Sequence, residues 1–268
     1  MTIVIKMGDR VINSVLSEST LNDLAKITHQ MPTVLVHGGG DTVTSIAEKL
    51  GIPQKFVTSP EGFRSRYTDS ETIQVFTMVM AGKINKEIVR HLQSRKIPAV
   101  GLSGLDGALI RAERKQKLIV KDERGRRRII DGGYTGKITH IDNSLLETLL
   151  SAGYVPVIAP IALGSENESL NLDGDRTAAY VAGALRANLL LLLTDVEGVS
   201  LEGSVVPRLS AAEAKRRISD LGPGMITKVY AALEALSMGV GRVMISSGHS
   251  ENPFTSAIQE QVGTVVEA

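Results

Sequence analysis

Hydrophobic residues along this chain gather in short, nearly continuous runs that are separated by longer stretches with helical spacing. Six runs, rich in β-branched residues and bounded by glycine, proline or polar residues, lie at 2–6, 33–38, 98–103, 155–160, 189–195 and 242–247. Continuous apolarity, rather than strict alternation of apolar and polar positions, is typical of strands buried on both faces. The pattern therefore predicts six buried strands.

The stretches between these runs predict helices at 19–29, 42–50, 70–94, 144–152, 176–187, 211–218 and 225–238. Alternation of strands with helices predicts an α/β fold, with an open, mostly parallel sheet sandwiched between helix layers. Two polar segments, 55–69 and 117–136, have turn residues between short strand-like runs and predict exposed β-hairpins added to the sheet. We expect one domain over 1–268, with an N-terminal lobe to about residue 165 and a C-terminal lobe from about 166.

Composition narrows the class of protein. The chain has no cysteine, which excludes disulfides, thiolate metal sites and cysteine nucleophiles. The apolar stretch at 188–195 is far shorter than the roughly 20 residues of a membrane-spanning helix. Charged residues near the N-terminus, among them Lys6 and Arg10, do not fit a secretory signal. We therefore expect a cytoplasmic protein without a membrane segment.

Charge is nearly balanced over the whole chain but not locally. There are 30 Lys plus Arg against 29 Asp plus Glu, whereas residues 111–128 contain nine basic and three acidic residues. A nucleic-acid-binding or regulatory module is disfavoured, because aromatic residues make up 3% of the chain and the net charge is only +1. The basic segment is then either a docking surface for an acidic partner or a solvated hairpin.

Residues that follow the predicted strands are rich in glycine and charge. Lys6 and Gly8 end the first strand, three glycines (38–40) lead from the second strand into a helix, and Thr194 and Asp195 end the fifth. Ligands of open parallel sheets bind beyond these strand ends, and glycines at a helix N-terminus offer free N–H groups to phosphate. A plain tight turn is the alternative.

Other candidate residues lie at two loop-to-helix junctions. Asn171 and Asp175 flank one junction, where an acid could orient lysines or cap a helix, and Lys228 follows Gly224 at the other. The familiar nucleotide motifs are absent: the stretch 132–139 lacks the first glycine and the hydroxyl residue of a P-loop, and no G-x-G-x-x-G follows the first strand. A nucleotide would therefore need a different arrangement.

Six motifs in order resemble the amino acid kinase family and, within it, N-acetylglutamate kinase. They are KMG at 6–8, HGGG at 37–40, GFRSRYTD at 62–69, NLDGD at 171–175, TDVEGV at 194–199 and GPGMITKV at 222–229. GFRSRYTD, and the basic segment that leads into DGGYTGKI at 131–138, are similar to the carrier-dependent branch, the LysW-aminoadipate and LysW-glutamate kinases.

This resemblance implies ATP-dependent phosphorylation of a side-chain carboxylate in lysine or arginine biosynthesis. The acceptor would be 2-aminoadipate or glutamate attached to the acidic C-terminus of the small carrier protein LysW. A kinase for free N-acetylglutamate is the alternative, since it shares nearly all the catalytic residues. The resemblance also implies a homodimer built on the N-terminal lobe, and Mg²⁺ held mostly through ATP phosphates rather than by dedicated protein ligands.

Catalytic roles follow from the matched motifs. Lys6 would contact the transferring phosphoryl group and Lys228 the leaving side of the nucleotide, while Asp175 would hold both lysines. N–H groups for the phosphate and the reacting carboxylate would come from four glycines: Gly8, Gly38, Gly39 and Gly40. One position departs from the family pattern, because Asp9 replaces a second glycine after KMG and adds a negative charge beside a polyanion.

Binding roles are implied in the same way. Arg64 would pair with the substrate α-carboxylate, and Asn171 would bind near its amide nitrogen. The nucleotide site would be lined by Thr194, Asp195, Gly224 and Met225. The carrier would dock on Arg124, Arg126, Arg127, Arg128 and Lys137, with Arg66, Tyr67 and Tyr134 guiding its tethered end toward Lys6.

Overall fold

The computed structural model describes the backbone of residues 1–268 and every side chain apart from those of residues 13 and 14. Its central sheet has eight strands in the order β16-β18-β17-β13-β1-β2-β10-β5. The six predicted strands are confirmed and are parallel to one another: β1 (Ile3–Met7), β2 (Thr33–His37), β5 (Ala99–Ser103), β10 (Val155–Ala159), β13 (Leu189–Thr194) and β17 (Arg242–Ser247). The sequence pattern did not predict the edge strand β16 (Arg208–Ser210) or its neighbour β18 (Thr264–Glu267), which is antiparallel to β17.

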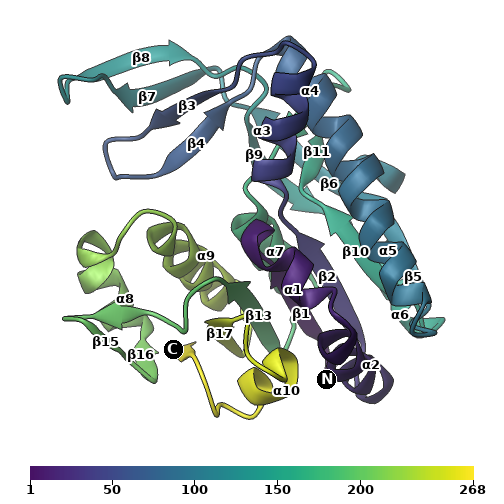
Figure 1. The fold of residues 1–268 in the computed structure, drawn as a ribbon. Coiled ribbons are helices and arrows are strands. Elements are labelled where there is room, and N and C mark those ends of the chain that lie inside the picture. The colour runs from purple at the N-terminus through teal and green to yellow at the C-terminus, as the bar shows by residue number, and fades with distance from the viewer.

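Helices cover both faces of this sheet, as predicted (Figure 1). One hydrophobic core lies under α2 (Glu18–Gln30), α3 (Gly40–Lys49), α4 (Ser70–Thr77), the π-helical η2 (Met78–Ile84), α5 (Asn85–Gln93) and α10 (Pro253–Ile258). The other lies under α6 (Ser144–Ser151), α7 (Gly174–Ala184), α8 (Ala211–Arg217) and α9 (Met225–Ser237). The short elements η1 (Asp9–Val11), α1 (Ile12–Val15), η3 (Asp106–Ala108) and η4 (Ile218–Asp220) join these layers. No helix in the described part of the chain has the length and apolarity that a membrane crossing demands.

A second, four-stranded sheet in the order β12-β11-β6-β9 extends the N-terminal half. It consists of β6 (Ile110–Arg114), β9 (Gly136–Ile141), β11 (Ile161–Leu163) and β12 (Ser169–Asn171). The sequence pattern did not predict it. β11 and β12 have only three residues each, too few to show a period, whereas β6 alternates buried and exposed residues over most of its five residues and was missed. A further small pair, β14 (Ser200–Leu201) and β15 (Ser204–Val205), lies in the C-terminal half.

Both predicted hairpins are present, as β3 (Lys55–Thr58) with β4 (Arg64–Tyr67) and β7 (Lys117–Lys121) with β8 (Arg127–Asp131). Their predicted addition to the central sheet is wrong, because each hairpin forms its own two-stranded sheet. They lie next to each other through β3 and β7 and project from the rest of the N-terminal half, on the side of α9 (Figure 1). Along β7 exposed residues alternate with buried or half-buried ones, so this hairpin has one covered face, whereas β3 and β4 show no such alternation.

Candidate active site

The carboxyl ends of β1, β2 and β13 meet at the middle of the central sheet. Lys6 on β1 is in register with Val36 on β2 and Leu192 on β13. Two adjoining cavities, of about 700 and 680 Å³, open beyond these strand ends, and Lys6, Asp9 and Gly40 line both. The strand order changes direction here, which is where open α/β sheets bind ligands. Two ligands could therefore meet beside Lys6.

A buried carboxylate joins two lysines at the boundary of the cavities. Asp175, in the first turn of α7, has Oδ1 2.8 Å from Nζ of Lys6, and its Oδ2 accepts a hydrogen bond of 2.9 Å from Nζ of Lys228 in the first turn of α9. The side chains of Lys6 and Asp175 are 8% and 7% exposed. The predicted contact of Asp175 with both lysines is confirmed.

The three charges shift one another's pKa. Burial alone would raise the pKa of Asp175, but the positive charges of Lys6 and Lys228 outweigh it and lower this pKa to about 2. Burial, with the nearby charge of Lys228, lowers the pKa of Lys6. For Lys228 burial acts in the same direction, but the attraction of Asp175 prevails and raises its pKa. Asp175 is therefore ionised at neutral pH and holds two ammonium groups about one carboxylate.

The four predicted glycines differ in what their N–H groups can do. The N–H of Gly8 donates to the carbonyl of Leu193 at 3.1 Å, and that of Gly38 donates to the carbonyl of Met7 at 2.9 Å. Their predicted role as N–H donors to a phosphate or carboxylate is wrong, because hydrogen bonds between the strand ends already use both groups. Each glycine still lines one of the cavities.

Gly39 and Gly40 keep the predicted place, where the chain enters α3 beside the larger cavity. At Gly39 a side chain would not fit, because a Cβ atom there would lie 2.2 Å from Cδ1 of Ile84. Glycine here therefore lets the start of α3 pack closely against η2.

Asp9 occupies part of the same helix end. Its Oδ2 accepts a hydrogen bond from the N–H of Asp41 in the first turn of α3. Burial raises the pKa of Asp9. The hydrogen bond from Asp41 acts in the opposite direction, and repulsion from the charge of Asp41 raises the pKa further. The carboxylate of Asp9 thus lies at the N-terminus of α3, where the sequence predicts a phosphate. Its side chain points toward this helix end and not away from it.

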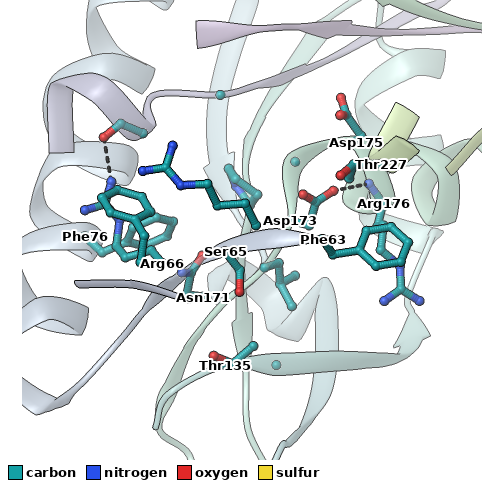
Figure 2. Close-up of a pocket in the computed structure, with 18 of the residues that line it drawn as sticks. Phe63, Ser65, Arg66, Phe76, Thr135, Asn171, Asp173, Asp175, Arg176 and Thr227 are labelled. Carbon is teal, nitrogen blue, oxygen red and sulfur yellow. Dashed lines mark hydrogen bonds between the residues drawn. The ribbon is translucent and has the colours of Figure 1, made fainter. Parts of the chain in front are cut away.

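Arg64 and Asn171 both line the larger cavity, where they were predicted to bind the acceptor. Arg64 stacks over the ring of Phe56, at 4.5 Å from the ring centre. Asn171, at the end of β12, donates a hydrogen bond of 2.9 Å to Oγ1 of Thr68. Figure 2 shows Asn171, Ser65 and Asp175 among the side chains that line this cavity.

The larger cavity also contains charged residues that the sequence did not indicate. Arg176, labelled in Figure 2, lines this cavity. It binds both carboxylate oxygens of Glu234, at 2.8 and 2.5 Å, and stacks over Tyr230. Lys115 lines the cavity, and burial and the charge of Arg176 lower its pKa. Arg176 directly follows the NLDGD motif and could have been found there, whereas Lys115 lies outside every motif.

All four residues predicted for the nucleotide, Thr194, Asp195, Gly224 and Met225, line the smaller cavity. Gly224 begins α9 with φ +87°, which favours glycine at this position. The sequence did not indicate Arg10, which pairs with Asp195 at 2.9 Å and lines this cavity.

Arg66, predicted to guide the tethered end of the carrier toward Lys6, lines the larger cavity but is not exposed on the surface. Its side chain is buried and its guanidinium donates to the carbonyl of Gly40 at 2.7 Å, to Oγ1 of Thr44 at 2.9 Å and to Gln54. A forked donor suits several acceptors at once. Arg66 therefore attaches β4 to the N-terminus of α3.

The two tyrosines predicted to guide the substrate do not line either cavity. Tyr67 and Tyr134 are half-buried, and the ring of Tyr134 lies under the guanidinium of Arg114 at 4.4 Å. Next to Tyr134, a Cβ atom on Gly133 would lie 2.3 Å from the carbonyl of Thr68. The DGGY segment is thus a close backbone junction rather than a ligand loop, which agrees with the rejection of a P-loop.

The predicted arginine run divides within the β7–β8 hairpin. All four arginines are exposed, but Arg126 and Arg128 donate to Oδ2 of Asp122 at 3.0 and 3.1 Å, whereas Arg124 and Arg127 form no ion pair with the carboxylates that the structure describes. The fifth predicted docking cation, Lys137, is exposed on β9 in the second sheet, outside this hairpin.

Known proteins resemble the chain over almost its full length. The sequence profile of the amino acid kinase family matches residues 1–247. The LysW-aminoadipate/LysW-glutamate kinase of Sulfolobus acidocaldarius is 47% identical over 266 residues, which cover 99% of this chain and 100% of that protein. A protein of Cenarchaeum symbiosum, provisionally given the same name, is 52% identical over 264 residues and 98% of both chains.

A solved structure shares the fold. The crystal structure of smu.665 from Streptococcus mutans UA159 is 25% identical and covers 100% of this chain and 98% of its own, with a TM-score of 0.81. The profile match, these relatives and the ordered motifs around the lysine–aspartate–lysine cluster agree, and they show that the chain belongs to the amino acid kinase family.

Proposed function

We propose that this protein transfers the γ-phosphoryl group of ATP to the side-chain carboxylate of 2-aminoadipate, glutamate or both, attached to the carrier protein LysW. The names of full-length relatives at 47% and 52% identity support this acceptor. The observation that carries the proposal is the placement of Lys6, Asp175 and Lys228 where the two cavities meet. One cavity would hold the acceptor and the other the nucleotide.

The reaction needs no protein nucleophile. An oxygen of the acceptor carboxylate forms the new bond to the γ-phosphorus, the bond from that phosphorus to the β,γ-bridging oxygen breaks, and the products are an acyl phosphate and ADP. Two anions must approach each other, so positioning and positive charge are the main requirements. Lys6 would contact the transferring group and Lys228 the departing phosphate, while Asp175 holds both ammonium groups.

The remaining residues would bind the two substrates in the two adjoining cavities. Arg64 and Asn171 would bind the α-carboxylate and the amide of the acceptor, with Gly39 and Gly40 near the reacting carboxylate. Thr194, Asp195, Gly224 and Met225 would line the nucleotide site. We assign acceptor binding and dimerisation to residues up to about 165 and ATP binding to the rest, since the second cavity is lined largely by C-terminal residues.

Mg²⁺ would supply positive charge to the phosphates of ATP. The described residues contain no group of three or more His, Cys, Asp or Glu side chains placed to hold a metal ion. An ion that comes with the nucleotide fits the smaller cavity. The wall of this cavity offers lysine and backbone groups to the phosphates, and the carboxylates of Asp9 and Asp195 also line it. The chain itself would then position the phosphates through Lys6 and Lys228.

We also propose a cytoplasmic homodimer that associates through the N-terminal half. The edge strand β5 and the exposed Met78 on the α4–α5 helical segment offer a surface there. Light scattering coupled to gel filtration tests this, and a monomer at micromolar concentration would contradict it.

Acyl phosphate trapping tests the proposed reaction. The purified chain with ATP and Mg²⁺ is incubated with LysW-linked aminoadipate, LysW-linked glutamate or free N-acetylglutamate, and the product is captured with hydroxylamine. We expect hydroxamate from a carrier-linked acid and little from N-acetylglutamate. Product from N-acetylglutamate alone would replace the carrier-linked acceptor with the free acid.

A further inference from the structure

Arg10 is an exposed cation in the smaller cavity, which we assign to ATP. It lies in η1, which follows β1 and packs against α3 and β13. Its guanidinium pairs at 2.9 Å with Oδ2 of Asp195, the first residue after β13, and both side chains line this cavity. The side chain of Arg10 is 71% exposed. An ion pair with so exposed a partner contributes little to stability, so the guanidinium can change partners with little loss of free energy.

The other cations of the smaller cavity are already engaged. Lys6, Arg64 and Lys228 line it together with Arg10. Asp175 holds the two lysines, and Arg64 also lines the larger cavity, where we assign it to the acceptor. The one ion pair that Arg10 forms with the described side chains is the exposed pair on the cavity wall. Arg10 is therefore the cation of this cavity that is most readily available to a new anion.

Three carboxylates of the smaller cavity oppose the binding of a polyanion. They belong to Asp9, Asp41 and Asp195. The hydrogen bond to Asp195 raises the pKa of Arg10, and the charges of Asp195, Asp41 and Asp9 add to this shift, so the guanidinium lies near all three. A cation among these carboxylates offsets their repulsion of a bound polyphosphate. The guanidinium fork also matches two phosphate oxygens at once.

We infer that Arg10 is a further nucleotide-binding residue, and that its guanidinium exchanges Asp195 for phosphate oxygens when the nucleotide enters the smaller cavity. This inference rests on the proposed function, which places ATP there. The donors that now pair with a carboxylate can bind a phosphate in the same way. In the alternative, Arg10 only holds Asp195 in place. The first role depends on the phosphates of the ligand, whereas the second does not.

Calorimetric titration of the full chain with nucleotides and Mg²⁺, without an acceptor, tests this inference. Arg10→Gln should weaken the binding of ATP and ADP roughly tenfold at low salt and reduce the salt dependence of ATP binding. The binding of adenosine, which has no phosphate, should not change. Arg10→Lys should recover part of the affinity for ATP, because lysine keeps the charge but not the fork.

Arg95→Gln is the matched control. Arg95 also pairs with a single carboxylate, that of Glu18, at 2.9 Å, but it lines neither cavity. This variant should bind ATP, ADP and adenosine like wild type. Thermal unfolding confirms that each variant is folded.

The outcomes separate the role of Arg10 from the reaction. If Arg10→Gln weakens adenosine binding as much as ATP binding, Arg10 only positions Asp195 and the inference is overturned. Equal affinity of wild type and Arg10→Gln for ATP overturns it as well, and in both cases the proposed reaction stands. A wild-type chain that does not bind ATP would contradict the proposed function and this inference together.

Discussion

Asp175 bridges two lysines that approach from different elements. Lys6 ends a central strand, Lys228 begins a helix, and one buried carboxylate neutralises part of their charge. Removing one member of such a cluster leaves an uncompensated charge inside the protein. The resulting loss of stability is larger than the stabilisation that the complete cluster contributes. The cluster therefore both positions the two ammonium groups and limits their repulsion.

Replacement of Asp175 by Asn should separate this role from a general effect on charge. We expect kcat to fall by about 100-fold or more, because an amide cannot hold two ammonium groups at the transferring phosphoryl group. Steady-state kinetics of acyl phosphate formation measure kcat, and circular dichroism confirms that the variant is folded. Asp122→Asn is the matched control, since Asp122 also pairs with two cations but lies on the hairpin. A folded Asp175→Asn enzyme with near wild-type kcat would contradict the assigned role.

Asp9 gives a second prediction at this scale. Its carboxylate binds the N–H of Asp41 at the end of α3 and lines the cavity assigned to ATP. Asp9→Asn removes the negative charge but keeps an acceptor, so KM for ATP should fall roughly tenfold if this charge repels the nucleotide. Asp41→Asn removes a charge from the same turn and leaves Asp9 in place. An unchanged KM in Asp9→Asn would show that the carboxylate does not oppose ATP.

At the scale of elements, two attachments hold the wall of the larger cavity. Arg66 joins β4 to the start of α3, and His37 joins the end of β2 to the long helical segment. His37 is fully buried, with Nδ1 2.8 Å from the carbonyl of Gly38 and Nε2 3.2 Å from Nδ2 of Asn85. The neutral ring can donate at one nitrogen and accept at the other, which a protonated ring cannot.

His37 should make stability depend on pH. Burial lowers the pKa of His37 to about 4 from its ordinary 6.5. The unfolded chain therefore binds the proton more readily than the folded chain does. The stability that the neutral His37 contributes is present above pH 6.5 and is lost as the pH falls toward 4. Between pH 7 and 5 the free energy of unfolding should fall by about 2 kcal/mol from this group. Urea denaturation measures it. His37→Gln should reduce the slope, and the exposed His29→Gln should not; equal slopes in all three proteins would contradict the assignment.

At the scale of the whole molecule, the N-terminal and C-terminal halves of the chain touch across the larger cavity. Phe63, in the turn between β3 and β4, meets Tyr230 of α9 edge to face, with ring centres 5.5 Å apart. The hairpin that carries Arg64 is thereby positioned against the helix that carries Lys228. The acceptor and nucleotide sites are then not independent.

A double-mutant cycle over Phe63→Leu and Tyr230→Leu tests this coupling. Each change keeps an apolar side chain but removes the ring contact, so each should lower kcat/KM for the carrier-linked acid, and the two effects should be coupled by about 1 kcal/mol. Thermal unfolding of the wild type, the two single variants and the double variant checks that the lower kcat/KM does not come from a loss of stability. Additive effects would show that the contact does not link the lobes.

Sequence reasoning recovered the elements whose pattern is local and strong. The run at 189–195 is continuously apolar and became the fully buried β13, and the seven predicted helices are all present. It did not recover the edge strand at 208–210 or the second sheet, whose strands are short and partly polar. Periodicity reports burial along a few consecutive residues, so strands of three residues are too short to show it. β6 and β9 have five and six residues but carry charged side chains at exposed positions instead of a continuous apolar run.

The sequence by itself determined the α/β class, the six central strands and the ordered motifs that indicate an amino acid kinase. Only the tertiary structure decided which predicted groups remain available: the N–H groups of Gly8 and Gly38 are used by neighbouring strands, Arg66 is buried, and two hairpin arginines are paired with Asp122. A motif specifies residue types along the chain. Hydrogen-bond partners and exposed faces depend on which distant segments pack together, because each donor is satisfied by whatever acceptor the fold brings within reach.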